Sequence, residues 1–284
     1  MDSRGRESDV LDRVEDLDVE YFVATGLVAP FDQVVLTRMP RLHDAETVMK
    51  TVVILQSNYI PWKGYFDLMH DADEFILFDD RQYTRQDWRN RNQVKADNGP
   101  QWLTVPVIGR FGQRIDETAI ANRGWTSSHW NRLTQLYRQA AHFKTYAAQV
   151  EAMYCSAADE QMLSSVNRLF LEGIGKLLGL NTRLRWSSEF PAFEGKTAAL
   201  VALCKATGST RYVSGPAARD YLETGLFEQA GIEVSFKSYE GYPVYSQLYP
   251  PFAHGVTVLD LLFNVGPDAP WYIWGWRDAP RAGT

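Results

Sequence analysis

The sequence is poor in the residues that most often bind metals. Its 284 residues include only two cysteines and five histidines. Cys155 and Cys204 have no spacing typical of a metal or redox site, and the histidines are scattered along the chain. We therefore predict two buried thiols, no zinc centre and chemistry that does not depend on a metal.

Long hydrophobic runs are also missing. A membrane-spanning helix needs roughly 20 consecutive apolar residues, and no run in this chain approaches that length. The chain does not begin with the charged and then apolar stretch that directs secretion. These absences predict a cytoplasmic protein without a membrane partner.

The chain has no excess of positive charge. Its net charge is −6, and residues 1–49 carry 11 acidic and 5 basic side chains, which leaves 24 of each for residues 50–284. A neutral body argues against a general nucleic-acid partner. We predict an acidic N-terminal extension over 1–49 and an α/β catalytic body over 50–284.

The glycine patterns of several common enzyme classes are absent too. The chain has neither a Walker loop nor the glycine fingerprint of dinucleotide-binding folds. It also lacks the Gly-x-Ser-x-Gly elbow, so we do not interpret Ser214 as a hydrolase nucleophile.

The segment between residues 56 and 95 is the richest in functional groups. The apolar run Val52–Leu55 leads into a polar and aromatic loop, and a second apolar run, Phe75–Phe78, ends on Asp79 and Asp80. The order strand, loop, helix, strand is typical of the opening unit of an α/β sheet. Because ligands bind beyond the carboxyl ends of such strands, we predict the site at this rim.

The rest of the chain favours a Rossmann-like α/β fold with a helical middle. We expect a first α/β unit over 50–125, helices over 126–183 and a second α/β unit over 184–284, with mixed or parallel strands. Within the second unit, a helical segment over 196–207 precedes a strand that runs into a tight turn over 210–216.

Five segments of the chain resemble the WbqC-like protein family. They occur in order between residues 51 and 266, and their combination is specific. These segments are Gln56–Phe66, Trp88–Asn92, Trp102–Pro106, Ser214–Leu222 and Leu259–Asn264. The chain departs from the family pattern in its N-terminal extension and at Ser57, where the family commonly has proline. We expect the loss of this proline to loosen the loop.

The resemblance implies a biosynthetic enzyme of a natural-product or surface-polysaccharide pathway. It favours a transferase that moves an aminoacyl or acyl group to a small-molecule amine or amino sugar. The donor would be phosphopantetheine-linked or nucleotide-linked, without a resident cofactor, and an acyl-carrier protein is a partner that this chemistry allows. Two alternatives stay open: a nucleotide-dependent transferase or ligase, and a non-catalytic carbohydrate-binding protein that uses Tyr239, Tyr242, Tyr245 and Tyr249.

Arg89, Arg91 and Lys95 are the main candidates for an anion site. On a strand these three cations share one face, because side chains alternate with a period of two. Converging cations suit a phosphate group, and the alternative is a solvated strand edge paired with nearby aspartates. The full set of predicted substrate-binding residues is Asn58, Tyr59, Lys63, Arg89, Asn90, Arg91, Lys95, Ser214, Arg219 and Tyr221.

His129 and Asp79 are the predicted catalytic residues. His129 follows Ser127 and Ser128 at the expected start of a helix, where the helix dipole lowers the pKa of an imidazole and keeps it neutral as a base. A surface histidine is the alternative, and His254 is the second choice of base. Asp79 is expected to act as a base, the alternative being a turn cap or an ion pair.

The turn after the strand at 210–214 is a second predicted anion contact. The free backbone N–H groups of Ser214–Pro216 can hold an anion, with Arg219 one turn further on. A purely structural turn is the alternative.

Overall fold

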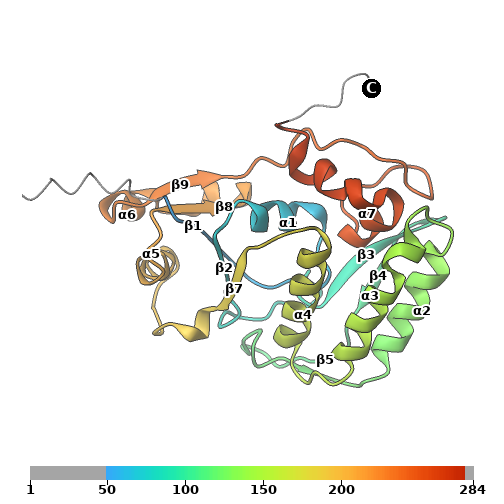
Figure 1. The fold of residues 1–284 in the computed structure, drawn as a ribbon. Coiled ribbons are helices and arrows are strands. Elements are labelled where there is room, and N and C mark those ends of the chain that lie inside the picture. The colour runs from blue at the N-terminus through green and yellow to red at the C-terminus, as the bar shows by residue number, and fades with distance from the viewer. Residues whose placement is uncertain (1–48, 279–284) are drawn as a thin grey trace, which may run out of the picture. The chain divides into compact units, whose positions relative to one another are not determined.

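The computed structural model describes residues 49–278 (Figure 1). The predicted extension over 1–49 lies outside the described residues, apart from Met49. A five-stranded sheet forms the centre of the described part, and helices pack on both of its faces.

All five strands of the central sheet run parallel. Their spatial order is β7 (Arg183–Trp186), β2 (Glu74–Leu77), β1 (Thr51–Leu55), β8 (Arg211–Ser214) and β9 (Glu233–Phe236). In chain order this is third, second, first, fourth and fifth. The direction of the connections therefore reverses between β1 and β8, and doubly wound sheets bind their ligands in the crevice at such a point.

Two apolar cores cover the two faces of the sheet. One core contains α1 (Lys63–His70) and α4 (Leu163–Leu177), and the other contains α5 (Thr197–Ala206) and α6 (Thr224–Gln229). Successive buried residues of β1 belong to opposite cores, because side chains of a strand point alternately to its two faces. This alternation explains why the apolar runs of the sequence are continuous.

A long insertion separates β2 from β7. It contains two antiparallel hairpins followed by helices. Its elements are β3 (Arg91–Ala96), β4 (Gly99–Thr104), β5 (Val107–Ile108), β6 (Ala119–Ile120), α2 (Trp125–Tyr137), α3 (Phe143–Ala157) and α4. The helical spacing of apolar residues in the sequence predicts α2 and α4. It does not predict α3, because few of the side chains of α3 are buried.

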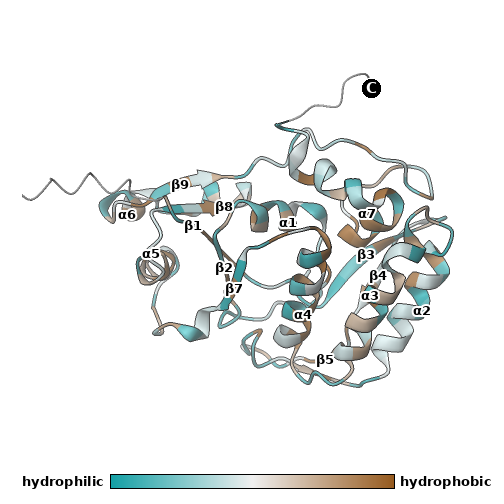
Figure 2. Ribbon diagram, in the orientation of Figure 1, coloured by the Kyte–Doolittle hydropathy of each residue, from teal (hydrophilic) through white to brown (hydrophobic). Residues whose placement is uncertain are grey.

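The C-terminal part of the described chain packs on the core that contains α1. Its apolar helix α7 (Val258–Val265) stands out in hydropathy (Figure 2), and six of its residues are buried. After the tight turn that follows β8, where the sequence favours a helix from residue 217, the chain forms a short 3₁₀ helix. The short helices are η2 (Ser187–Glu189), η3 (Pro216–Asp220), η4 (Gly266–Asp268) and η5 (Trp271–Gly275).

The predicted α/β class is confirmed, and the sheet is parallel throughout. The two expected α/β units both contribute strands to this one sheet. Cys204 is buried as predicted, but the prediction for Cys155 is wrong, because Cys155 lies on the exposed side of α3. Among the described residues, no helix has both the length and the apolar character needed to span a membrane.

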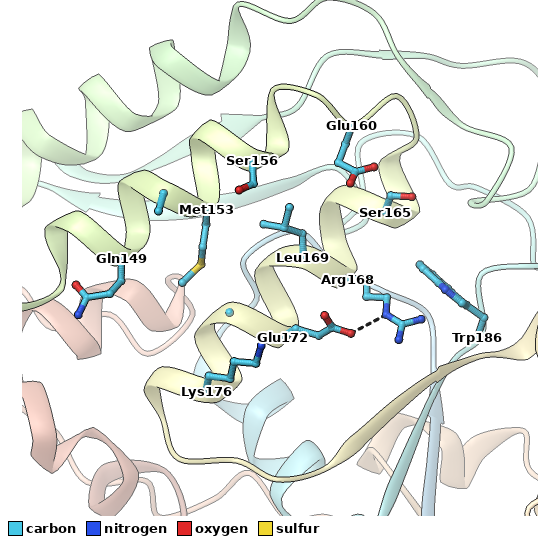
Figure 3. Close-up of a pocket in the computed structure, with 12 residues that line it drawn as sticks. Gln149, Met153, Ser156, Glu160, Ser165, Arg168, Leu169, Glu172, Lys176 and Trp186 are labelled. Atoms are coloured by element: carbon cyan, nitrogen blue, oxygen red, sulfur yellow. Dashed lines mark hydrogen bonds and ion pairs between the residues drawn. The ribbon is translucent and has the colours of Figure 1, made fainter.

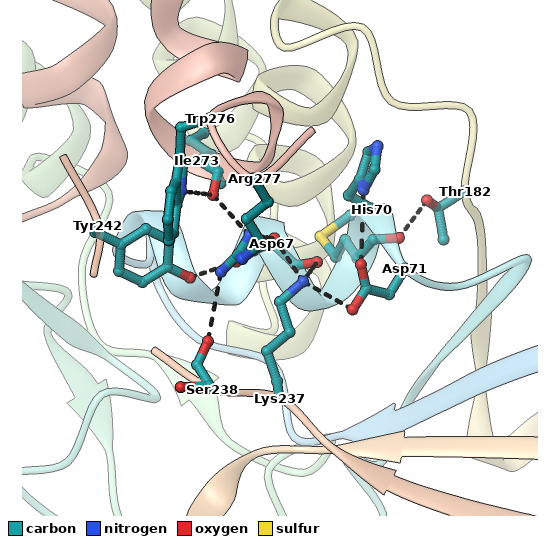
Figure 4. A network of polar contacts seen from close by, with 11 residues as sticks. Asp67, His70, Asp71, Thr182, Lys237, Ser238, Tyr242, Ile273, Trp276 and Arg277 are labelled. Atoms are coloured by element: carbon teal, nitrogen blue, oxygen red, sulfur yellow. Dashed lines mark hydrogen bonds and ion pairs between the residues drawn. The ribbon is translucent and has the colours of Figure 1, made fainter. Parts of the chain in front are cut away.

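Asp67 of α1 connects the C-terminal segment to the apolar core that contains α1. Its side chain is fully buried and binds three partners (Figure 4). Lys237 Nζ lies 2.7 Å from Oδ1, Arg277 Nη2 lies 2.8 Å from Oδ2, and the Tyr242 hydroxyl donates to Oδ2. A buried charge is tolerated only when it is paired and hydrogen-bonded, and Asp67 meets both conditions.

Removing the Asp67 carboxylate should therefore destabilise the fold. Asp67→Ala leaves Lys237 and Arg277 without their buried partner, and we expect the free energy of unfolding to fall by about 3 kcal/mol. Glu172→Ala is the control, because it breaks a more exposed ion pair with Arg168, a kind worth less than about 1 kcal/mol. Urea unfolding measures both losses, and equal losses would contradict the importance of Asp67.

Candidate functional site

The crevice between β1 and β8 contains a cavity of about 290 Å³. We call it the switch-point cavity. It lies beyond the carboxyl ends of the two strands, at the rim that the sequence predicts. Its polar lining includes Gln56, Arg81, Lys196, Thr197, Ser214 and Tyr221.

Two cations of the switch-point cavity, Lys196 and Arg81, were not predicted from the sequence. Lys196 is exposed at the start of α5 and, within residues 49–278, has no hydrogen bond or ion pair. Arg81 stacks its guanidinium 4.2 Å from the centre of the Phe78 ring and donates to the Phe193 carbonyl at 3.2 Å. Arg81 also pairs with Asp80 at 3.7 Å, so Lys196 and the positive end of the α5 dipole supply the unpaired positive charge that favours an anionic ligand.

A sequence signal for these residues does exist. Gly195-Lys196-Thr197 immediately precedes a helix and equals the last three positions of a Walker loop. The position that would hold the first glycine of that loop is Phe190, so a search for the complete motif does not find it.

A second cavity, of about 270 Å³, lies on the other side of the loop that follows β1. We call it the aromatic cavity. It is lined by Asn58, Pro61, Trp62, Trp88, Asn92 and Gly255.

Arg89 lies between the two cavities. Its Nη2 donates to Oε1 of Gln56, which lines the switch-point cavity, and its Nη1 donates to Oδ1 of Asn58, which lines the aromatic cavity. The nearest carboxylate paired with it is Asp87, at 3.9 Å. Because amide oxygens carry no net charge, the positive charge of Arg89 is not neutralised by these contacts.

A buried network beneath Arg89 holds the loop in place. Asp79, only 1% exposed, accepts the Ser57 backbone N–H at 2.7 Å and the Ser164 hydroxyl. The Asn167 amide donates to Ser57 Oγ and to the Arg89 carbonyl, both at 2.9 Å. Burial raises the pKa of Asp79, and the hydrogen bonds from Ser164 and Ser57 oppose that shift.

This network bears on Ser57 and on one predicted catalytic residue, Asp79. We expected Ser57 to loosen the loop, and in this structure its N–H donates to Asp79, a contact that proline, without an N–H, could not make. The Asp79 carboxylate points into protein rather than into either cavity. We therefore treat Asp79 as a residue that positions the loop.

Lys63 is buried at the start of α1, below the rim. Its ammonium lies 4.8 Å from the centre of the Tyr242 ring and 5.5 Å from that of Tyr245, and donates to the Pro243 carbonyl at 3.3 Å. Burial lowers the pKa of Lys63 to about 8, against the opposing effect of Asp67. Lys63 is therefore used within the protein and lines neither of the two cavities.

Sequence comparison places the chain among known proteins. A model described as the WbqC-like protein family matches residues 56–272. This chain belongs to the WbqC-like protein family. It is also 47% identical over 227 residues to a Mycobacterium tuberculosis (strain ATCC 25618 / H37Rv) protein named "Uncharacterized protein Rv1507c", an alignment that covers 79% of this chain and 98% of that protein. The resemblance seen in the sequence is confirmed.

His129 lies in the interior of this WbqC-like protein, away from both cavities' linings. α2 begins at Trp125, so His129 is in the second turn and not at the helix start. Its Nδ1 is 2.9 Å from the Tyr59 hydroxyl, which also bonds the Tyr154 hydroxyl at 2.8 Å. Burial, rather than the helix dipole, lowers the pKa of His129 to about 4.

The predicted cluster of three cations does not form, because each has a different environment. Arg89 binds the loop, Arg91 stacks 4.1 Å from the centre of a Trp102 ring, and Lys95 is 1% exposed in the core. Of the three, Arg89 alone lies between the cavities. The neighbouring Asn90 is buried and donates to the Val105 carbonyl at 2.9 Å.

The predicted residues of the β8 turn lie on the rim. Ser214 and Tyr221 line the switch-point cavity, and Ser214 accepts a hydrogen bond from Tyr212 at 3.3 Å. Arg219 is exposed, with its guanidinium 5.2 Å from the centre of the Phe236 ring. The structure therefore brings Asn58, Arg89, Ser214 and Tyr221 together around the rim, with Tyr59 and Lys95 buried elsewhere.

The largest cavity described, about 570 Å³, lies between α3 and α4 (Figure 3). Its cation Arg168 is committed to protein partners: Glu172 at 2.7 Å and the Leu184 carbonyl at 3.2 Å. The Arg168 guanidinium also stacks 4.9 Å from the centre of the Trp186 ring. We do not place the functional site here, because its arginine is already paired and the cavity lies away from the point between β1 and β8 where the strand order reverses.

Protonation of His129 should destabilise this WbqC-like protein in acid. Its pKa is about 4 in the folded protein and about 6.5 in the unfolded chain, so the unfolded chain takes up the proton first as the pH falls. Stability is therefore full above pH 6.5 and declines towards pH 4, by about 3 kcal/mol at the limit.

His129→Gln removes the titrating group from this buried position. We expect the unfolding free energy of the variant to lose its dependence on this titration between pH 6.5 and pH 4. Urea unfolding at a series of pH values measures the difference. Parallel pH curves for the two proteins would contradict a buried neutral imidazole.

Proposed function

We propose that the protein is a transferase of a biosynthetic pathway that moves an acyl or aminoacyl group from a phosphate-bearing donor to an amine. The observation that carries the proposal is the position of Arg89, which contacts one lining residue of each cavity. Two cavities joined at a cation whose closest contacts are neutral amide oxygens suit a reaction between two substrates.

The switch-point cavity is the proposed donor site. Lys196, Arg81 and the start of α5 would hold the donor phosphate, which can belong to a nucleotide or to phosphopantetheine. This replaces the anion site expected from Arg91 and Lys95. The aromatic cavity, across Arg89, is the proposed acceptor site.

The reaction needs a base and a group that stabilises an oxyanion. The acceptor nitrogen attacks the acyl carbon and forms the C–N bond, while the bond from that carbon to the phosphate oxygen or thiol sulfur breaks. The leaving group takes the electron pair, and the nitrogen loses a proton. Arg89 is placed to stabilise the negative oxygen of the tetrahedral intermediate.

His254 is the proposed base, in place of His129. It precedes Gly255, which lines the aromatic cavity, and within the described residues its ring has no hydrogen bond. Partial burial and then the Lys63 charge lower the pKa of His254. The imidazole is therefore neutral at pH 7 and able to accept the proton.

A nucleotide-dependent transferase or ligase is the second candidate. Gly195-Lys196-Thr197 at the start of α5 favours it, because these residue types hold nucleotide phosphates in Walker loops. The two candidates share the donor site and differ in the donor that binds there.

Thermal-shift screening should identify the donor class. The panel contains ATP with magnesium, CTP with magnesium, nucleotide sugars, coenzyme A and a pantetheine thioester. Any ligand that binds only the folded state raises the melting temperature, by an amount that grows with the ratio of its free concentration to its Kd. Stabilisation by free nucleotides alone supports the second candidate, and stabilisation by the pantetheine compounds supports the first.

The effective ligand should lose affinity by about tenfold or more in Lys196→Ala, because a charge-assisted phosphate contact is lost. Lys205→Ala is the matched control, since Lys205 is an exposed lysine at the opposite end of the same helix. Equal effects of the two substitutions, or no shift with any member of the panel, would contradict the proposed donor site.

His254→Ala should reduce turnover by about 10²–10⁴ without changing the thermal shift produced by the donor. In the unsubstituted protein, turnover should fall in acid with a midpoint below pH 6.5, because partial burial and then the Lys63 charge lower the pKa of His254. Acyl transfer to the amine, followed by mass spectrometry, measures both. An unchanged rate in His254→Ala excludes it as the base.

A further inference from the structure

We propose that the aromatic cavity binds a pyranose ring, so that the acceptor is an amino sugar. The identity of this ring as the acceptor rests on the proposed function, whereas the binding site itself does not. Four observations carry the inference: an exposed tryptophan pair, a rigid aromatic wall, a free amide donor and a cavity of limited size.

The tryptophan pair forms a platform at the cavity. Trp88, which lines the cavity, and Trp102 are each 42% exposed, and their ring centres are 5.2 Å apart. The Arg91 guanidinium lies 4.1 Å from the centre of the Trp102 ring. Large aromatic faces left in water at a cavity provide a stacking surface for the apolar face of a ring.

The opposite wall of the cavity is rigid. A Cβ atom on Gly64 would lie 2.3 Å from Cζ2 of Trp62, so only glycine lets this indole lie against the start of α1. Tyr239 packs edge-on against the same ring, with centres 5.0 Å apart. Trp62 is therefore fixed before any ligand arrives, which reduces the entropy lost on binding.

The polar groups of the cavity suit hydroxyl oxygens. Asn58 Oδ1 accepts from Arg89, so its Nδ2 group is oriented and, within the described part of the chain, has no hydrogen-bond partner. Asn92 is 1% exposed, and both ends of its amide are used within the protein: Nδ2 donates to the Tyr59 carbonyl at 3.1 Å and Oδ1 accepts the Gln93 N–H at 2.7 Å. Aromatic faces with one fixed free donor, on Asn58, match the apolar face and a hydroxyl of a sugar.

The charge and size of the cavity favour a pyranose over the other ligands that stack on tryptophan. None of its lining residues is charged, which gives no reason for a phosphate to bind there. Its volume of about 270 Å³ is at the small end of ligand sites. The size therefore suits a single ring better than an oligosaccharide, and the absence of charged lining residues argues against a nucleotide.

Ligand-observed NMR and calorimetry with glucosamine, methyl glucopyranoside and adenosine test this site without any donor. We expect the two pyranosides to bind in the millimolar range, and Trp88→Ala to weaken them by about tenfold or more. Phe111→Ala is the matched control, because Phe111 is a fully exposed aromatic side chain outside the cavity lining, and its loss should leave affinity unchanged.

The substitution Asn58→Asp tests whether Asn58 contributes to ligand binding independently of its contribution to folding. The carboxylate keeps an acceptor for Arg89 but removes the free donor, so we expect unchanged thermal stability and weaker pyranoside binding. Absence of pyranoside binding to the unsubstituted protein, equal effects of Trp88→Ala and Phe111→Ala, or binding of adenosine alone would overturn the inference. Pyranoside binding without any donor in the thermal-shift panel would instead leave this site standing and reject the transferase.

Discussion

The hydrogen bonds accepted by one buried carboxylate hold the functional rim together. Asp79 lies two residues after the end of β2, accepts the Ser57 N–H from the loop after β1, and accepts the Ser164 hydroxyl from α4. Asn167, also from α4, extends the network to Ser57 Oγ and to the Arg89 carbonyl. Two strand ends, a helix and the segment before β3 are thus fixed by groups that water does not reach.

The same network explains how one short loop serves two cavities. Ser57 points inward to its buried partners, so the residues on either side of it, Gln56 and Asn58, project the other way in an extended segment. Both therefore reach the Arg89 guanidinium, yet each lines a different cavity. A proline at position 57 could not donate to Asp79, so this connection between the loop and the buried carboxylate depends on the serine.

The sequence predicts the rim better than it predicts the individual contacts. Continuous apolar runs followed by polar loops identify β1 and β2, and parallel strands place their carboxyl ends together, so the position of the site follows from the local pattern. Burial of a polar residue has no such pattern, because it depends on partners from distant segments. His129 is buried because Tyr59, 70 residues away, supplies its hydrogen bond.

The cations illustrate the same limit. Period-two alternation correctly places Arg91 and Lys95 on one face of β3, but it cannot show that this face meets Trp102 at one end and the protein core at the other. Lys196 and Arg81 are far apart in sequence and meet at one cavity only because the chain crosses from β7 to β8 through α5. Their association is a property of strand order.

The polar groups of the molecule fall into two sets with different energetic consequences. Three side chains, those of Asp67, Asp79 and His129, are buried and hydrogen-bonded within the protein. A ligand that took their place in these hydrogen bonds would leave the present partners buried and unpaired, which costs free energy. Lys196 and the Nδ2 group of Asn58 have no hydrogen-bond partners among residues 49–278, so a ligand could bind them without breaking a contact of the fold. Because a ligand gains most from donors that the fold has left free, recognition belongs to the second set and rigidity to the first.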